Sequence, residues 1–170
     1  LKNISSFHSH ITPLKVDWTP FPRFLPIDKF SSLLSLDIDL SDFKLDDIAL
    51  EDVFNNRNII NLNVKNAGGS LKWLKNFSNL KVLEFTTNSG KVEDEECFKY
   101  LDNLEELTFT SSKFKNLDFL AECKKLKKLD LHVSYSSSSY SDDIKLESID
   151  FLNKLDNLED LTISGLNDYE

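Results

Sequence analysis

The sequence predicts an α/β solenoid, with parallel strands on one side and short helices or 3₁₀ turns on the other. Leu104 is followed by Leu107 and Phe109, and the last two are apolar residues two positions apart, a period that is typical of a strand. From residue 117 to 126 the apolar residues instead recur at every third position, which indicates a tight helical or 3₁₀ turn. The strand pattern then returns at 126–131, 22 residues after its first appearance. Strand and turn therefore alternate as a repeat.

The strand pattern recurs in six copies along the chain. Its positions are Leu33/Leu36/Ile38, Ile59/Leu62/Val64, Leu80/Leu83/Phe85, Leu104/Leu107/Phe109, Leu126/Leu129/Leu131 and Leu158/Leu161/Ile163. All 18 are apolar, as are 16 of the 18 positions that lie nine, six and three residues earlier, with Asn56 and Glu95 as the exceptions. A composition of 40% hydrophobic residues would fill only about 14 of these 36 positions, so the repeat is not a chance arrangement.

This pattern resembles the short class of leucine-rich repeat, with about 22 residues per copy, found in protein phosphatase regulatory subunits and bacterial internalins. The resemblance covers at least Phe24 to Leu166. It implies a parallel sheet on the concave side, short turns on the convex side and a role in binding other proteins. The family's ninth position is usually Asn, which only Asn88 retains. We therefore expect looser turns where the other copies carry Ser41, Ala67, Ser112, Ser134 and Leu166.

The chain divides into an N-terminal segment and the repeat array. Residues 1–23 hold three of the four prolines and predict an irregular segment or a partial repeat, with Leu1, Ile4 and Ile11 as its weak strand pattern. Residues 24–170 form the solenoid of about six repeats. The chain contains no Met, so we expect it to be part of a larger protein.

Three of the connections between strands are longer than a tight turn requires. Acidic residues open helical patterns at 41–56 and at Lys91–Leu101, and the second helix should bury Phe98 and Leu101. Ser134–Asp143 is a serine-rich insertion that contains Tyr135 and Tyr140. This insertion is either a mobile surface loop or a rim loop whose tyrosines contact a partner.

The residues that alternate with the inward leucines should form the concave face. Three columns cross it: Ser35, Asn61, Val82, Glu106, Lys128, Asp160; then Asp37, Asn63, Glu84, Thr108, Asp130, Thr162; then Asp39, Lys65, Thr86, Thr110, His132, Ser164. Six of the 18 are acidic and two are basic. The candidate partner-binding residues are Asp37, Asp39, Asn63, Lys65, Glu84, Thr108, Asp130, His132 and Asp160, with Tyr135 and Tyr140 on the rim. The alternative is a solvated polar face without a partner, because aromatic anchors are missing from the columns.

The residue types and motifs that the chain contains argue against catalysis and against bound cofactors. His8 and His10 form an H-x-H pair without a third metal ligand at usable spacing, and no nucleophile or phosphate-loop motif is present, so we expect neither an enzyme nor a metal. A net charge of −9 argues against nucleic acid, and no stretch has the length of a membrane span. Cys123 occupies a core position and Cys97 should be half buried; two such cysteines favour a reducing, intracellular compartment.

These observations predict a non-catalytic module that recognises a protein through its concave sheet and rim loops. Its acidic columns favour a basic partner. The second hypothesis is a structural arm that packs against neighbouring domains or subunits of its own protein. An exposed apolar end of the solenoid would favour that second hypothesis.

Overall fold

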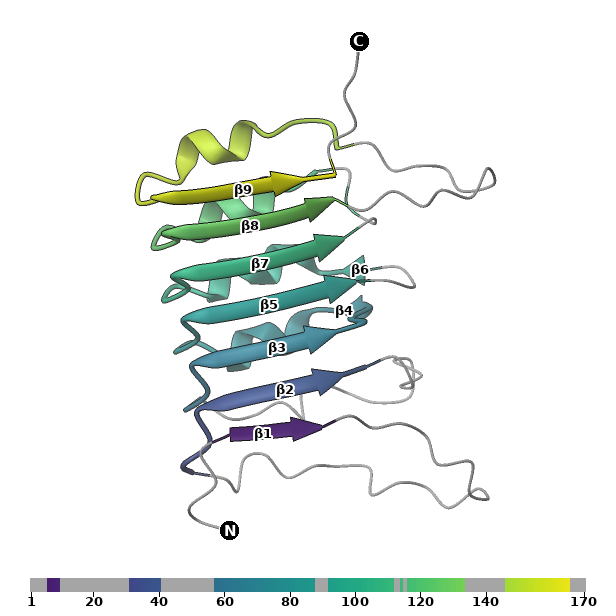
Figure 1. The fold of residues 1–170 in the computed structure, drawn as a ribbon, viewed down its shortest axis with the longest axis vertical. Helices are drawn as coiled ribbons and strands as arrows, with labels where there is room; N and C mark the ends of the chain where they lie inside the picture. The colour runs from purple at the N-terminus through teal and green to yellow at the C-terminus, as the bar shows by residue number, and fades with distance from the viewer. Residues whose placement is uncertain are drawn as a thin grey trace, which may run out of the picture.

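The computed structural model describes residues 6–9, 31–40, 57–87, 92–111, 114, 116–133 and 146–165. Seven parallel strands form one sheet in the order β1-β2-β3-β5-β7-β8-β9 (Figure 1). Their bounds are β1 Ser6–Ser9, β2 Ser35–Asp39, β3 Asn61–Lys65, β5 Val82–Thr87, β7 Glu106–Ser111, β8 Lys128–Val133 and β9 Asp160–Ser164. Each of the five inner strands pairs with the copies before and after it in the chain, which is the arrangement of a solenoid.

The register between the strands reproduces the predicted alignment of the repeats. Leu36 lies opposite Leu62, Leu83 opposite Leu107, and Leu129 opposite Leu161. Because neighbouring side chains in a strand point to opposite faces, one shared register sends every leucine of this set inward.

Short 3₁₀ helices cover the inward face of the sheet. They are η3 Lys72–Asn76, η4 Glu95–Tyr100, η5 Asp118–Glu122 and η6 Asp150–Lys154. The main chain explains the three-residue apolar period, since the N–H groups of Leu74, Phe77 and Leu80 each donate to the carbonyl three residues earlier at 2.9–3.0 Å. With three residues per turn, every third side chain faces the same way, and here it faces the sheet.

The core between sheet and turns is closely filled and rich in phenylalanine. Phe85 and Phe109 stack with their ring centroids 5.5 Å apart, and Phe98 reaches them edge-on from η4. Phe114 and Phe119 extend the cluster on the far side of Phe109. Aromatic pairs at such separations add to the stability that burial provides.

The segment around η4 differs from the predicted helix at Lys91–Leu101. Val92–Glu93 instead forms a short strand, β6, which pairs in parallel with β4, Gly69–Ser70. Asp94 then adopts a left-handed conformation, φ 62°, and the helix is of the 3₁₀ type. Phe98 and Leu101 are buried as expected. The prediction that Cys97 is half buried was wrong, because this tight turn faces the thiol inward and leaves Cys97 only 5% exposed.

Three other predicted features lie partly or wholly outside the described residues. Strand β1 falls within the segment 1–23 that was expected to be irregular or a partial repeat, and the domain boundary at residue 23 stays a prediction. The helix predicted at 41–56 and the insertion Ser134–Asp143 are outside the described part of the chain. Among the residues that are described, none belongs to a helix long and apolar enough to span a bilayer.

Candidate functional site

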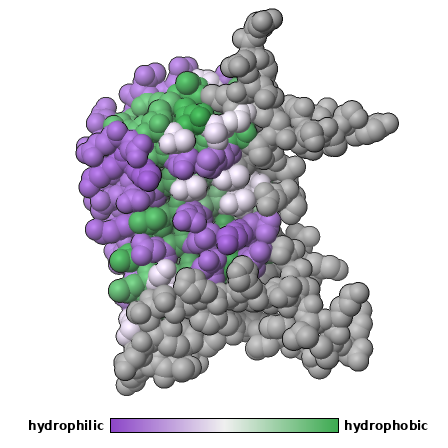
Figure 2. All heavy atoms as spheres, in the orientation of Figure 1, coloured by the Kyte–Doolittle hydropathy of each residue, from purple (hydrophilic) through white to green (hydrophobic). Residues whose placement is uncertain are grey.

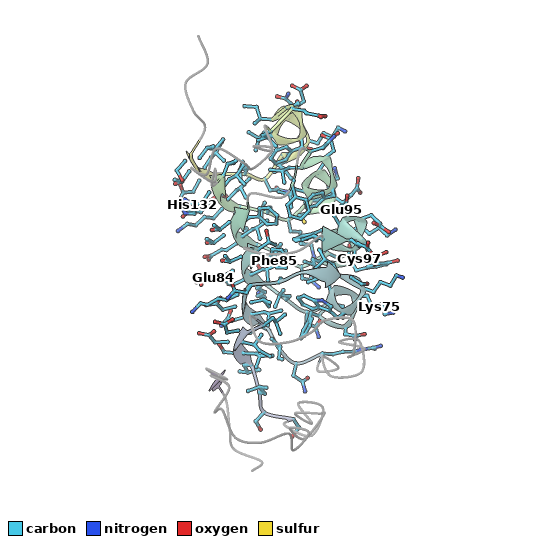
Figure 3. The ribbon with its side chains drawn as sticks, turned by 90° about the vertical axis from the view of Figure 1, so that its right-hand side faces the viewer. Lys75, Glu84, Phe85, Glu95, Cys97 and His132 are labelled. Carbon is cyan, nitrogen blue, oxygen red and sulfur yellow. The ribbon has the colours of Figure 1, made fainter. Side chains whose placement is uncertain are left out.

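The side of the sheet away from the 3₁₀ helices carries the three predicted columns, and we call it the open face. Figure 3 shows Glu84 and His132 projecting from the sheet on this side, whereas Phe85 points into the core toward the turn that holds Cys97. The strand register aligns the first column from Ser35 through Glu106 and Lys128 to Asp160. The same register places His8 of β1 opposite Asp37.

The candidate residues of the sheet therefore gather on one surface. The candidates Glu84 and Asp160 are exposed there, as are two further residues of the first column, Glu106 and Lys128. The remaining candidates on the sheet are half buried: Asp37, Asp39, Asn63, Lys65, Thr108, Asp130 and His132. Tyr135 and Tyr140 lie outside the described residues, so the predicted rim loop is not placed.

Asp39 is held at the carboxyl end of its strand. Its Oδ1 accepts a hydrogen bond of 2.8 Å from Nδ2 of Asn66, one repeat later. Asn66 can reach it because its backbone is left-handed, φ 58°, a conformation that Asn tolerates better than most residues. The bond helps to fix the direction of the Asp39 carboxylate.

His132 links two strands of the open face. Its Nδ1 contacts the hydroxyl of Ser164 on β9, and its Nε2 lies 3.1 Å from Oδ1 of Asp130. The contact with Asp130 lacks the alignment of a hydrogen bond, so it is an electrostatic attraction that needs a protonated imidazole. Ser164, His132 and Asp130 thus contact one another in a Ser-His-Asp order. Acyl transfer by Ser164 would also need hydrogen-bond donors aimed at the developing oxyanion, and these contacts alone do not supply them.

The edge at which the strands begin carries a row of asparagines, which we call the amide ladder. Nδ2 of Asn58, Asn79, Asn103 and Asn157 donates to the carbonyl of Ser31, Arg57, Ser78 and Lys124, respectively, at 2.7–3.2 Å. Each Asn directly precedes the first apolar position of its repeat, which is Ile59, Leu80, Leu104 or Leu158, and each acceptor lies one repeat earlier. The sequence analysis did not predict this ladder, because the family's usual Asn is at the ninth position of the repeat, near the other end of the strands. The recurrence of Asn before four of the six first positions of the strand pattern was the available signal.

Charged residues alternate beside the amide ladder. Glu105 lies 2.8 Å from Nζ of Lys127 and 3.2 Å from Nζ of Lys81. Hydrogen bonds from Lys127, and then from Lys81, hold the pKa of Glu105 below its ordinary value. The same bond raises the pKa of Lys127. Because all three side chains are accessible to solvent, these two ion pairs contribute little to the stability of the fold.

A shallow depression of about 480 Å³ opens at this same edge. Its lining comes from the amide ladder and the adjacent column: Ser31, Leu34, Asn58, Ile60, Asn79, Lys81 and Asn103. The amides of Asn58, Asn79 and Asn103 already donate to backbone carbonyls. Their donor hydrogens are therefore partly committed to the backbone.

Both cysteines are free and buried. Burial raises the pKa of the Cys123 thiol to about 12, and it raises the pKa of Cys97 as well, with further contributions from Glu96 and Asp94. A thiol needs its thiolate form to bind metal or attack a substrate. Within the described ranges, no group of three or more His, Cys, Asp or Glu side chains is arranged to hold a metal ion.

The architecture is similar to that of an internalin C2 from Listeria monocytogenes str. 4b F2365, with a TM-score of 0.51 and 14% identity. That match covers 82% of this chain and 65% of the internalin. A second internalin of the same strain, inlF, matches at 15% identity over 81% of this chain and 62% of its own, with a TM-score of 0.27. This chain thus spans less than two thirds of either protein. No protein-family model and no curated protein matches the sequence.

At 14% identity the likeness concerns the fold alone. Parallel strands, short 3₁₀ turns and a repeating leucine core make this chain a leucine-rich-repeat solenoid. The fold class expected from the apolar pattern is therefore confirmed.

Proposed function

We propose that this solenoid is a non-catalytic recognition module that binds a basic segment of another protein across its open face. The observation that carries the proposal is the charge of that face. The strand register lines up six acidic residues against two basic ones on a single surface. Such a surface attracts a positively charged partner and rejects an acidic one.

The geometry favours a partner that runs across the strands. Asp37 and Asp39 lie at the β2 side, Glu84 on the central strand β5, and Asp130 with Asp160 toward β9. Strands in a sheet lie about 4.8 Å apart, so a segment crossing six of them meets carboxylates along about 24 Å. A basic helix or extended peptide has that reach. Asn63 and Thr108 lie between the acids and supply neutral hydrogen-bonding groups.

A charge-neutralising comparison tests this role. The open-face variant carries Asp37→Asn, Asp39→Asn, Glu84→Gln and Asp130→Asn. A matched control removes the same number of charges from the 3₁₀ helices, through Glu95→Gln, Glu96→Gln, Glu122→Gln and Asp150→Asn. The binding is measured on an array of peptides that carry increasing numbers of basic residues. We expect the wild-type chain and the control to bind a peptide more tightly the more basic residues it has. The open-face variant should bind the basic peptides about ten-fold more weakly.

Cross-linking mass spectrometry in native extract then identifies the partner. Cross-links from the open face to a basic protein should be present in the wild-type chain and the control, and absent in the open-face variant. Equal array binding by all three proteins, or loss in the control alone, would contradict a role for the open face.

One observation favours the second candidate function, a structural arm that packs by its end against neighbouring domains or subunits of its own protein. Ile149 and Leu161, at the β9 end, remain 43% and 44% exposed. The two functions use different surfaces, so each can be tested without the other.

A further inference from the structure

The middle column of the open face alternates between acidic and neutral residues from one strand to the next. The register aligns its six members in a single row across the sheet: Asp37, Asn63, Glu84, Thr108, Asp130 and Thr162. A carboxylate therefore occurs on every second strand, and an amide or a hydroxyl occurs on each strand between. We call this set the middle row. Figure 2 looks onto this side of the molecule and shows hydrophilic residues mixed with residues of intermediate hydropathy.

The middle row carries the negative charge of the open face without a basic residue of its own. In the first column, Lys128 lies opposite both Glu106 and Asp160. In the third column, Lys65 lies opposite Asp39. Acids and lysines thus offset one another on both sides of the row, and charge complementarity directs a basic partner to the row itself.

The spacing of the acids discriminates between peptide conformations. Neighbouring strands lie about 4.8 Å apart, so carboxylates on alternate strands recur about every 9.6 Å. A polyproline II helix has three residues per turn and rises about 3.1 Å per residue, so every third side chain faces the same way at intervals of about 9.3 Å. Side chains on one side of a fully extended chain recur at about 6.8 Å. Seven residues of an α-helix rise about 10.5 Å, a mismatch that grows to about 1.8 Å across three acids.

The neutral residues of the middle row favour the same conformation. Asn63 and Thr108 lie on the strands between the acids, where an amide and a hydroxyl can donate hydrogen bonds. The backbone of a polyproline II helix makes no internal hydrogen bonds, so its carbonyl oxygens are open to such donors. An α-helix already uses its carbonyl groups internally and would give the two side chains no acceptor.

Given the proposed function, on which this inference rests, we propose that the middle row binds a partner segment in polyproline II conformation with a basic residue at every third position. The basic side chains lie against Asp37, Glu84 and Asp130. Carbonyl groups between them accept hydrogen bonds from Asn63 and Thr108. The proposed function requires only that the partner be basic, whereas this arrangement also specifies its spacing and its backbone conformation.

The middle row is a lateral surface to which each of these repeats contributes. Further repeats at either end would stack beyond the outer strands and lengthen the row without covering it. Within the 170 residues, no three basic residues stand at successive three-residue intervals. The matching segment is therefore not one of this chain's own stretches, and the spacing assigns it to a partner protein.

Peptides of identical composition test the spacing. Each carries three lysines among prolines and serines, and the lysines stand at every second, every third or every fifth position. Because all of them have the same charge, we expect fluorescence anisotropy to show that the every-third peptide binds the full 170-residue chain about five-fold more tightly than the other two. An alanine-rich helical peptide with a lysine at every seventh position should bind as weakly as the mismatched peptides.

A charge-conserving exchange tests the middle row itself. Glu84→Thr with Thr108→Glu keeps the net charge but moves the central acid by one strand, so the three acids are no longer evenly spaced. The preference for the every-third peptide should then disappear. Glu122→Thr with Asn153→Glu moves an exposed acid between two 3₁₀ helices in the same way, and this control should keep the preference.

The outcomes separate this inference from the proposed function. Equal binding of all the basic peptides by the wild-type chain would overturn the spacing and leave the proposed function intact. Tighter binding of the helical peptide, or a preference that survives the exchange of Glu84 and Thr108, would also overturn it. Failure of the wild-type chain to bind any basic peptide would overturn both.

Discussion

The side chain of Asn103 donates a 2.9 Å hydrogen bond to the backbone carbonyl of Ser78, 25 residues earlier in the chain. Its own Oδ1 accepts a 2.8 Å hydrogen bond from Nζ of Lys125 in the following repeat. One amide thus connects three consecutive repeats at the edge where their strands begin. Local bonds of this kind matter in a solenoid, because each repeat is held mainly by its neighbours.

Asn103→Ala should therefore lower the free energy of unfolding by about 1 kcal/mol, the usual net value of a lost side-chain hydrogen bond. Urea denaturation followed by circular dichroism measures it. Asn153→Ala, at an exposed position of η6, is the matched control and should change stability by less than about 0.5 kcal/mol. Equal effects of the two changes would mean that the amide ladder has no stabilising role.

Glu105→Gln should reduce thermal stability in a way that depends on pH. The native pKa of Glu105 is lowered, so its contribution is present above the unfolded pKa of about 4.3 and is lost as pH falls through the native value. The pKa of Lys127 is raised, so its contribution is present below the unfolded pKa of about 10.4 and is lost as pH rises through the native value.

The difference in melting temperature between wild type and Glu105→Gln should consequently be greatest between about pH 5 and pH 10 and shrink outside that window. Added salt should shrink it as well, because the three side chains are accessible to solvent. Calorimetry across pH checks both statements. Glu147→Gln, which removes one exposed acid elsewhere, should show no such window, and a window of equal size there would refute the assignment.

Phe109→Ala should be the most destabilising of these single changes. Phe109 is 1% exposed and stands at the centre of the aromatic cluster, between Phe85 and Phe119. Its removal leaves a cavity among rings that cannot all move inward, and large-to-small changes of this kind cost about 3–5 kcal/mol. Phe109→Leu retains more of the volume and should cost less than half as much in the same denaturation experiment. A loss below about 1 kcal/mol for the alanine variant would contradict the packing described.

Cys97 and Cys123 should resist thiol reagents in the folded protein. With the pKa of Cys123 raised to about 12, the thiolate fraction at pH 8 is on the order of one in ten thousand, and burial adds a steric barrier. Ellman's reagent should therefore modify neither cysteine within the time in which it fully modifies the urea-unfolded chain. Rapid native reaction of Cys123 would show that the core around η5 opens readily.

Gly165→Ala should loosen β9 from β8. Gly165 has φ 78°, and an added Cβ would overlap the carbonyl oxygen of Val133, the last residue of β8. The backbone strain alone costs about 1–2 kcal/mol. Hydrogen exchange should show faster exchange of the β9 amides with β5 and β7 unchanged, whereas unchanged protection in β9 would contradict the reported conformation.

Local periodicity was enough to predict the repeat, the register and the core. A two-residue period can bury one side of a strand only in one register, and a three-residue period suits a 3₁₀ turn, so Leu83, Leu107 and Leu129 had one consistent placement. The same alternation put Glu84 and His132 on the open face. Both predictions needed only the order of apolar and polar residues along the chain.

Contacts between repeats were decided by the tertiary structure. The bond between Asn103 and Ser78 depends on how closely two strand starts approach, and the exposure of Leu161 depends on the absence of a neighbour beyond β9 in the described structure. Neither is encoded in a single repeat. A leucine at 107 and a leucine at 161 read alike in sequence, and only the packing of adjacent layers makes one of them core and the other surface.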